Sequence, residues 1–263
     1  MFTIKDYVLP KTLEEAYHLL KSKRNNVILG GCAFLRMGSK KIQTAIDLSE
    51  LNLDFIREED ETIEIGAMTT FRSIETSSFL RNSFNGILSK AVEDIVGVQL
   101  RNIVTVGGTV YSRYGFSDFI TALLSLDTYV VLYDKGKITL EEFLEKGAEN
   151  DILIKIVIQK TSRKAVFQSM RNSKSDYAIL NTAVSKKDNE WKIVVGARPQ
   201  RAKIAVEASR YLMKSQLNKA NIQHAAKLAA DELAFGSNMR GSSEYRQLIC
   251  KALITRAITE VLS

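Results

Sequence analysis

The spacing of apolar residues predicts alternating helices and strands in the first half of the chain. Residues 12–21 are predicted to form a helix, because apolar side chains recur at helical spacing and Thr12 with Glu15 makes a capping box. Thr139 with Glu142 is a second capping box, and Ser117 is a third helix start. The pattern predicts further strands at residues 26–29, 43–47, 62–67 and 129–133, and further helices at 70–79, 87–97 and 117–126.

The second half of the chain has a different order of elements. Four strands are predicted in succession, at residues 152–159, 164–170, 177–185 and 191–196, with a hairpin turn at Asp188-Asn189. Helices are predicted to follow at residues 203–214, 221–233 and 243–262. Strands followed by helices indicate a separate α+β domain. We place the boundary near residues 155–160, which gives domains at 1–157 and 158–263.

Composition limits the cellular compartments in which the protein is expected and the metal sites that it can form by itself. The 263 residues contain no apolar run as long as a membrane span, and the first ten lack a signal-peptide core, so we expect a cytoplasmic protein. Two cysteines, Cys32 and Cys250, fit a reducing compartment. Two cysteines and two histidines are too few for an iron–sulfur cluster plus a metal site. His18 and His224 lie in helical patterns and are interpreted as surface or packing residues, so any metal is expected on a partner.

The net charge of +7 allows several kinds of anionic partner. An ordinary solvated basic surface, an anionic cofactor and an acidic partner subunit all fit this charge. Nucleic acid fits less well, because the lysines are scattered and no aromatic stripe lies among them. The charge alone therefore does not choose a function.

Two Gly-Gly pairs are the first candidates for chemistry. Gly30-Gly31 follows a predicted strand, and Gly107-Gly108 follows Arg101 and Asn102. Glycines can adopt positive φ, and successive N–H groups can then converge on a phosphate oxygen. Neither segment matches the dinucleotide fingerprint G-x-G-x-x-G or a P-loop. A tight turn without a ligand remains the alternative for each pair.

The segment after the second pair offers further polar and aromatic side chains. Asp118 could accept hydrogen bonds from ribose hydroxyls, or it could cap the helix that begins there. Tyr111, Tyr114 and Phe116 could cover a flat ring or could pack in a core. The residues alone leave both choices open.

Residues 98–132 resemble the flavin-contacting stretch of the FAD-binding medium subunits of molybdenum hydroxylases, the xanthine dehydrogenase and carbon monoxide dehydrogenase family. The positions that match this stretch are Arg101, Asn102, Thr105, Gly107, Gly108, Asp118, Leu123, Leu124, Leu126 and Asp127. Gly30-Gly31, Arg171 with Asp176-Tyr177-Ala178, and residues 241–246 with Arg256-Ala257 resemble further segments of the family in the same order. The resemblance therefore covers nearly the whole chain.

The resemblance implies a fold and a cofactor. The expected fold class is α+β: a PCMH-type, vanillyl-alcohol-oxidase-like FAD-binding domain of two α/β subdomains, followed by a C-terminal α+β domain. Electrons would pass from iron–sulfur clusters through FAD to NAD or another acceptor. The molybdenum cofactor and the [2Fe–2S] clusters would lie on a large and a small partner subunit, so no catalytic residue and no metal is expected in this chain.

The resemblance also implies which residues contact FAD. Gly30 to Leu35 would wrap the pyrophosphate, Gly107 to Thr109 would meet the flavin or its ribityl chain, and Arg171 would face the flavin ring or a phosphate. The full set of expected cofactor contacts is Leu29, Gly30, Gly31, Cys32, Ala33, Phe34, Leu35, Arg101, Asn102, Thr105, Gly107, Gly108, Thr109, Ser117, Asp118 and Arg171. Thr109 replaces the usual asparagine of the family, and Cys32-Ala33 replaces a Thr-Asp pair.

Two other functions are compatible with the same residues. One is a stand-alone FAD-dependent reductase of the same superfamily, like the reductase of cell-wall precursor synthesis. The other is an assembly or binding protein without flavin. The sequence does not specify the substrate of the complex, because the pocket that selects it would lie in another chain.

Overall fold

A computed structural model describes all 263 residues, and these form two compact units. Unit 1 comprises Met1–Ser73, Val98–Ser112 and Thr128–Lys160. Unit 2 comprises Ile74–Gly97, Arg113–Asp127 and Thr161–Ser263. Each unit therefore combines segments that are distant in the sequence.

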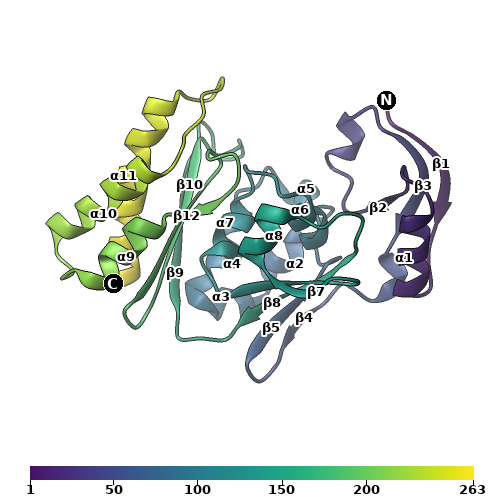
Figure 1. Cartoon of the computed structure of the whole chain (residues 1–263), viewed down its shortest axis with the longest axis horizontal. Coiled ribbons are helices and arrows are strands. Elements are labelled where there is room, and N and C mark those ends of the chain that lie inside the picture. Colours follow the sequence, from purple (N-terminus) through teal and green to yellow (C-terminus); the bar gives the residue numbers. More distant parts are fainter. The chain divides into compact units, whose positions relative to one another are not determined.

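Unit 1 begins with a small parallel sheet. Strands β1 (Thr3–Val8), β3 (Lys41–Asp47) and β2 (Val27–Leu29) lie in the order β1-β3-β2. Helix α1 (Leu13–Ser22) connects β1 to β2 and packs against β3 (Figure 1). The core between helix and sheet contains Ala16, Leu20 and Ile46.

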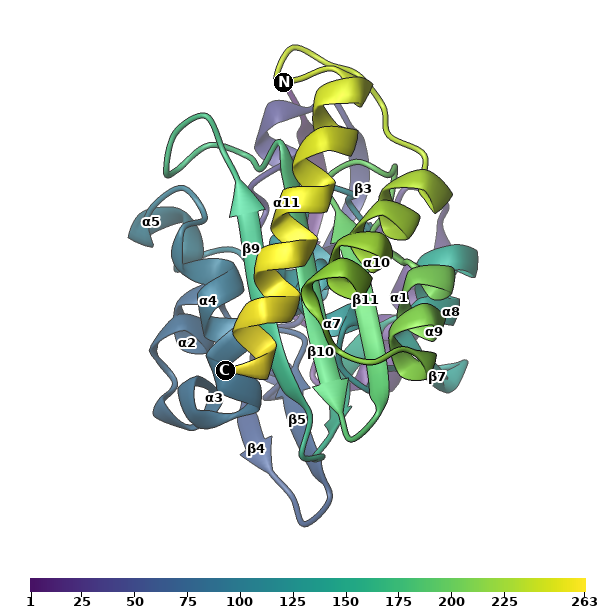
Figure 2. The ribbon, with the colours of Figure 1, turned by 90° about the vertical axis from the view of Figure 1, so that its left-hand side faces the viewer.

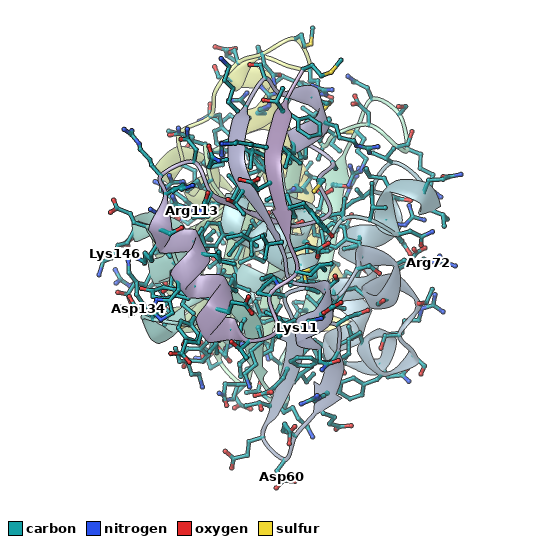
Figure 3. The ribbon with its side chains drawn as sticks, turned by 90° about the vertical axis from the view of Figure 1, so that its right-hand side faces the viewer. Lys11, Asp60, Arg72, Arg113, Asp134 and Lys146 are labelled. Atoms are coloured by element: carbon teal, nitrogen blue, oxygen red, sulfur yellow. The ribbon has the colours of Figure 1, made fainter.

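The start of α1 confirms the predicted capping residues. The Thr12 hydroxyl accepts a hydrogen bond from Glu15 N–H at 3.1 Å, and the Glu15 carboxylate accepts one from Lys11 N–H at 2.7 Å. Lys11, which Figure 3 labels, also pairs with Glu50 through its ammonium group. Side chains therefore satisfy the N–H groups of Glu15 and Lys11 at this helix start.

A five-stranded antiparallel sheet forms the rest of unit 1. Its strand order is β4 (Ile56–Glu58), β5 (Thr62–Gly66), β8 (Leu153–Gln159), β6 (Thr128–Leu132) and β7 (Gly136–Thr139). Asp60 marks the tip of the β4–β5 hairpin (Figure 3). Helix α6 (Val106–Ser112) contacts β5 and β8, and α8 (Leu140–Lys146) contacts β6 and β7. Thr139 caps α8 as predicted, since its hydroxyl accepts from Glu142 N–H at 3.2 Å.

Unit 2 is built on a four-stranded antiparallel sheet. Its order is β12 (Lys203–Ile204), β11 (Glu190–Gly196), β10 (Leu180–Lys187) and β9 (Lys164–Met170). Helices α9 (Val206–Lys214), α10 (Lys219–Glu232) and α11 (Ser243–Leu262) cover one face of this sheet (Figure 2). The core between them contains the buried Trp191, Ala226 and Leu253.

Two segments from the first half of the chain complete unit 2. One carries α3 (Ser78–Asn82) and α4 (Ile87–Glu93), and the other carries α7 (Asp118–Leu124). Helix α7 contacts β10 and β11, and Figure 1 places it on the opposite face of the sheet from α9, α10 and α11. Asp118, at the start of α7, therefore belongs to the same unit as β9 and β10.

Several predicted elements differ from the observed ones. The helix predicted at residues 70–79 is two helices, α2 (Phe71–Thr76) and α3, because the Ser77 hydroxyl accepts from Leu80 N–H at 3.3 Å and starts a new helix. The helix predicted at 87–97 ends at Glu93, and Val96 beyond it has φ +50°. The strand predicted at 177–185 begins only at Leu180.

Some short elements were not predicted at all. Strands β1, β4 and β12 are short, largely exposed or rich in polar residues, so they lack a strong strand pattern. The four-residue helix α5 (Val98–Arg101) was also missed. None of the helices is long and apolar enough to cross a membrane.

Candidate functional site

The two Gly-Gly pairs lie against each other in unit 1. A Cβ placed on Gly30 would lie 2.8 Å from the Cα of Gly108, and one on Gly31 would overlap the carbonyl oxygen of Ile103. None of the four glycines has a positive φ. The prediction that they are needed for left-handed backbone is therefore wrong. They are needed because two backbones approach more closely than any side chain permits.

The left-handed residue in the first segment is Cys32, with φ +57°. Its thiol donates a hydrogen bond to the carbonyl oxygen of Gly30, with an Sγ–O distance of 3.0 Å. Leu29 ends strand β2 before this turn, and Leu35 begins a short 3₁₀ helix after it, Leu35–Met37. A side chain in this conformation costs on the order of 1 kcal/mol, so the turn is held by its surroundings.

The backbone N–H groups of this turn are available to a ligand. The turn's own backbone hydrogen bonds begin at Arg36, whose N–H donates to Cys32 O at 3.3 Å. None of them uses the N–H groups of Gly31, Cys32 or Ala33, and these residues are only half-buried. Successive N–H groups around a left-handed residue form an anion-binding concavity. The first segment therefore combines a left-handed residue with unused N–H groups on either side of it.

The second Gly-Gly pair lies in the first turn of α6 and not in a loop. Gly107 N–H donates to Ala67 O at 2.7 Å, Gly108 N–H to the Thr105 hydroxyl at 3.1 Å, and Thr109 N–H to Thr105 O at 3.0 Å. These donors are all occupied within the protein. The prediction of a second phosphate nest is therefore wrong. The pair instead provides a surface without side chains against Gly30 and Gly31.

The residues before α6 have distinct positions. Arg101 is the last residue of α5 and is buried, whereas Asn102 is exposed. Thr105 is buried and serves as the N-cap of α6 through its bond to Gly108. This assigns Thr105 a role in positioning the glycines.

Burial and a nearby carboxylate affect the pKa of the Cys32 thiol, which the sequence did not indicate. Burial raises the pKa of its thiol, and the carboxylate of Asp47 raises it further. Asp47 lies at the end of β3 and accepts a hydrogen bond from the Tyr7 hydroxyl at 2.6 Å. Cys32 is therefore a neutral thiol at pH 7 and adds no negative charge to an anion site.

In unit 2, the structure brings Asp118 and Arg171 together. Ser117 caps α7 by accepting from Ile120 N–H at 3.2 Å, so the alternative in which Asp118 is the cap is wrong. Asp118 is buried and accepts from Arg171 Nη2 at 2.6 Å and from Asn181 Nδ2 at 2.5 Å. Burial raises the pKa of Asp118, while Arg171 and Asn181 oppose that rise.

The guanidinium of Arg171 has one nitrogen, Nε, without a hydrogen-bond partner. Its Nη1 donates to Asp176 O at 2.7 Å, its side chain is 9% exposed, and its Nε is buried without an acceptor. Leaving a buried donor unsatisfied costs about 1–3 kcal/mol.

The aromatic residues after the second Gly-Gly pair divide into two groups. Tyr111 is structural, because its hydroxyl donates to Ala148 O at 2.8 Å within unit 1. In unit 2, Tyr114 stacks on Phe116 with ring centroids 5.0 Å apart, and Phe116 meets Tyr177 edge-on at 4.9 Å. Tyr114 and Tyr177 are both partly exposed, and the guanidinium of Arg240 lies over the Tyr177 ring, 5.1 Å from its centroid.

Sequence reasoning missed Asn181, the second partner of Asp118. Its only signal is a polar side chain within the apolar run of β10. The histidines lie where they were expected: His18 is exposed beside Glu14 on α1, and the ring of His224 packs on that of Tyr211. Nowhere do three or more His, Cys, Asp or Glu side chains gather as possible metal ligands.

Comparison with known sequences decides the family. The model of the FAD binding domain in molybdopterin dehydrogenase matches residues 2–160, and that of the CO dehydrogenase flavoprotein C-terminal domain matches residues 165–261. The chain belongs to this flavoprotein family. FAD is therefore its cofactor, as predicted, and the open N–H groups of Gly31, Cys32 and Ala33 are compatible with such a ligand.

Individual relatives match this flavoprotein over nearly its whole length or over about half of it. It is 27% identical to the 6-hydroxypseudooxynicotine dehydrogenase complex subunit alpha of Paenarthrobacter nicotinovorans, over 98% of this chain and 94% of that one. It is 35% identical to the nicotinate dehydrogenase FAD-subunit of Eubacterium barkeri, over 48% of this chain and 45% of the other. Both relatives are subunits by name.

Solved structures confirm the predicted fold class. A carbon monoxide dehydrogenase chain from Hydrogenophaga pseudoflava superposes with a TM-score of 0.90 at 23% identity, covering 98% of this chain and 96% of that one. Quinoline 2-oxidoreductase from Pseudomonas putida 86 superposes with a TM-score of 0.88 at 21% identity, over 98% and 96%. The flavoprotein thus has an FAD-binding domain followed by a C-terminal α+β domain.

Proposed function

We propose that this flavoprotein is the electron-transfer subunit of a multi-subunit molybdenum hydroxylase. Support comes from the family, whose first domain is described as that of a molybdopterin dehydrogenase. It also comes from relatives named as a subunit of a dehydrogenase complex and as the medium subunit of a hydroxylase. The molybdenum cofactor and the [2Fe–2S] clusters would lie on a large and a small partner subunit. Bound FAD would supply a redox carrier between these clusters and an acceptor such as NAD.

The turn after β2 is proposed as the pyrophosphate site. The supporting observation is the set of unused N–H groups at Gly31, Cys32 and Ala33, beside a backbone held in left-handed geometry. The neutral thiol of Cys32 lets the phosphates approach without repulsion. Because backbone N–H groups bind the ligand, the Thr-to-Cys replacement leaves these donors in place.

The remaining predicted contacts take two kinds of role in this proposal. Thr105 and Ser117 act as helix caps, which place Gly108 and Asp118 respectively. Arg171 stays a proposed contact of the cofactor, and Asp118 holds its guanidinium through Nη2. Charge-assisted bonds of this kind contribute on the order of 1.5–3 kcal/mol.

Isolation of the complex tests the proposed function. A tagged chain, purified at low ionic strength from cells that naturally make it, should bring down an iron–sulfur protein and a molybdenum protein in equal amounts. Metal analysis should then find four irons and one molybdenum per flavin, about the content of two [2Fe–2S] clusters and one molybdenum cofactor. A chain that carries FAD but isolates alone, without iron or molybdenum, would contradict the assignment to a hydroxylase complex.

The electron acceptor is tested separately. We expect the isolated complex, reduced through its substrate or with dithionite, to reoxidise its flavin on addition of NAD⁺ with formation of NADH. If NAD⁺ has no effect and a quinone or a ferredoxin reoxidises the flavin instead, the NAD part of the proposal is wrong and the subunit assignment stands.

A further inference from the structure

The turn after β2 is followed at once by a single cation. Arg36 is the only charged residue in the segment 27–39. It lies in the 3₁₀ helix that begins as the turn ends, and its N–H donates to Cys32 O at 3.3 Å. The unused N–H groups of the turn carry only partial charges, whereas the guanidinium of Arg36 carries a full one. Arg36 is therefore the one source of full positive charge within this segment.

The side chain of Arg36 is available to a ligand. It is exposed, and it belongs to unit 1 together with the turn. The structure gives its guanidinium no hydrogen bond and no ion pair, whereas Arg163, Arg171 and Arg240 each pair with a carboxylate. A guanidinium presents a planar set of N–H donors that fits the oxygens of a phosphate group. Arg36 can therefore bind an anion without giving up a partner within the protein.

Asp47 places a carboxylate beside the same turn. It lies opposite Leu29 in the β2–β3 ladder, and Leu29 is the last residue before the Gly30-Gly31 pair. The Asp47 oxygens accept from the Tyr7 hydroxyl at 2.6 Å and from Ser49 N–H at 2.9 Å. Both donors are neutral, so the negative charge of Asp47 is not compensated by a cation.

The charges of Asp47 and Arg36 both act on the turn. Burial and then Asp47 raise the pKa of the Cys32 thiol, and Arg36 opposes that rise. A pyrophosphate group bound at the turn would be repelled by Asp47 and attracted by Arg36. Binding of such an anion therefore depends on the cation as well as on the backbone donors.

We propose that Arg36 is a further cofactor-binding residue, whose guanidinium pairs with the pyrophosphate of FAD and offsets the repulsion by Asp47. The inference rests on the proposed function, since it takes the turn after β2 as the pyrophosphate site. The family resemblance ended this group of contacts at Leu35, so Arg36 was not among the predicted residues.

The test is the affinity for FAD, measured by titrating the full chain, freed of flavin, with FAD. Arg36→Gln should raise the Kd about fivefold in about 50 mM NaCl, the loss expected for one exposed charge-assisted contact. In about 0.5 M NaCl the rise should be smaller, because salt screens exposed charges. Arg36→Lys keeps the charge and should lose less affinity than Arg36→Gln. The Tm of the flavin-free protein should not change, because the side chain is exposed and bonds to no other residue.

Two further variants separate a local contact from the loss of net charge. Arg24→Gln is the matched control and should leave the Kd unchanged. Arg24 is also exposed and without an ion pair, but it precedes β2, whereas the turn follows that strand. Asp47→Asn should lower the Kd, because it removes the repelling charge while its amide oxygen can still accept from Ser49 N–H. Damage to the fold would change the Kd in the opposite direction.

The outcomes separate this inference from the function on which it rests. If the wild-type chain binds FAD and Arg36→Gln binds it with unchanged Kd at low salt, the role of Arg36 is overturned and the function stands. The role is also overturned if Arg24→Gln raises the Kd equally, if the rise in Arg36→Gln is as large at high salt, or if Asp47→Asn raises the Kd. A wild-type chain that does not bind FAD would overturn the proposed function itself.

Discussion

At the scale of single residues, the missing side chains of the two Gly-Gly pairs have different consequences. Both pairs were candidates for phosphate nests, and the family resemblance placed the first at the pyrophosphate and the second at the flavin or its ribityl chain. The structure leaves open donors only beside Cys32, whereas the N–H groups of Gly107, Gly108 and Thr109 are all used within the protein. Gly31 is the position where the two backbones are closest, which makes it the most sensitive residue of the site.

Substitution of Gly31 tests this close approach. Gly31→Ala should destabilise the protein by about 1–3 kcal/mol and abolish FAD binding, because its Cβ would overlap the carbonyl of Ile103 and displace the turn. Thermal unfolding and FAD titration measure the two effects. Gly38→Ala is the control from the same segment, since its Cβ would meet nothing closer than 3.6 Å. Equal behaviour of the two variants would contradict the account.

The ion pair between Arg240 and Asp176 gives a pH-dependent prediction. The hydrogen bond from Arg240 and the N–H of Tyr177 lower the pKa of Asp176 from its usual 3.8. A lowered carboxyl pKa stabilises the folded protein above the unfolded-state pKa, and this contribution is lost as pH falls through the folded-state value.

Arg240→Gln should therefore lower the Tm at pH 6, and the difference from wild type should shrink as the pH falls below about 4. Arg210→Gln, which breaks an exposed pair with Glu207 on α9, should change the Tm little at any pH. A Tm difference for Arg240→Gln that is the same at pH 6 and pH 3 would show that the ion pair is not its cause.

At the scale of elements, helix starts were the best-predicted feature of the chain. Thr12, Ser117 and Thr139 were each recognised from local sequence, and each hydroxyl accepts the expected backbone N–H. Thr105 was missed as a cap, because the two glycines that follow it suggested a loop. Glycine is a poor helix former, and α6 exists because its first turn bonds to the end of β5.

Removal of the α6 cap should weaken cofactor binding, because this helix carries Gly107 and Gly108. Thr105→Ala should cost about 1 kcal/mol of stability and also raise the Kd for FAD. Thr139→Ala removes an equivalent cap from α8 and should cost a similar stability while leaving the Kd unchanged. Thr105→Ser should restore both properties. Equal losses of FAD affinity in Thr105→Ala and Thr139→Ala would contradict a role for α6 in the site.

Contacts between distant segments could not be predicted from the sequence. Local patterns gave the apolar helices and strands, but Gly30 beside Gly108 and Asp118 beside Asn181 depend on how whole elements pack. The family resemblance supplied Asp118 and Arg171 as candidates and did not indicate that they bond to each other. Asn181 had no signal beyond its polarity within an apolar strand.

At the scale of the whole molecule, two divisions of the chain coexist. The family models match residues 2–160 and 165–261, whereas the compact units combine separated segments, so that α4 and α7 join the C-terminal sheet. The strand at residues 153–159 closes the five-stranded sheet of unit 1, between β5 and β6. The boundary near residue 157 therefore stays a prediction about sequence domains. Unit 2 contains segments from both sides of that boundary.

The most direct test of the central claim is the flavin content of the purified chain. The account predicts a yellow protein that absorbs at about 450 nm, carries one FAD per chain, and releases FAD, not FMN, on denaturation. After removal of the flavin, added FAD should restore the absorbance at equal stoichiometry. A colourless protein that takes up no added FAD would contradict the account.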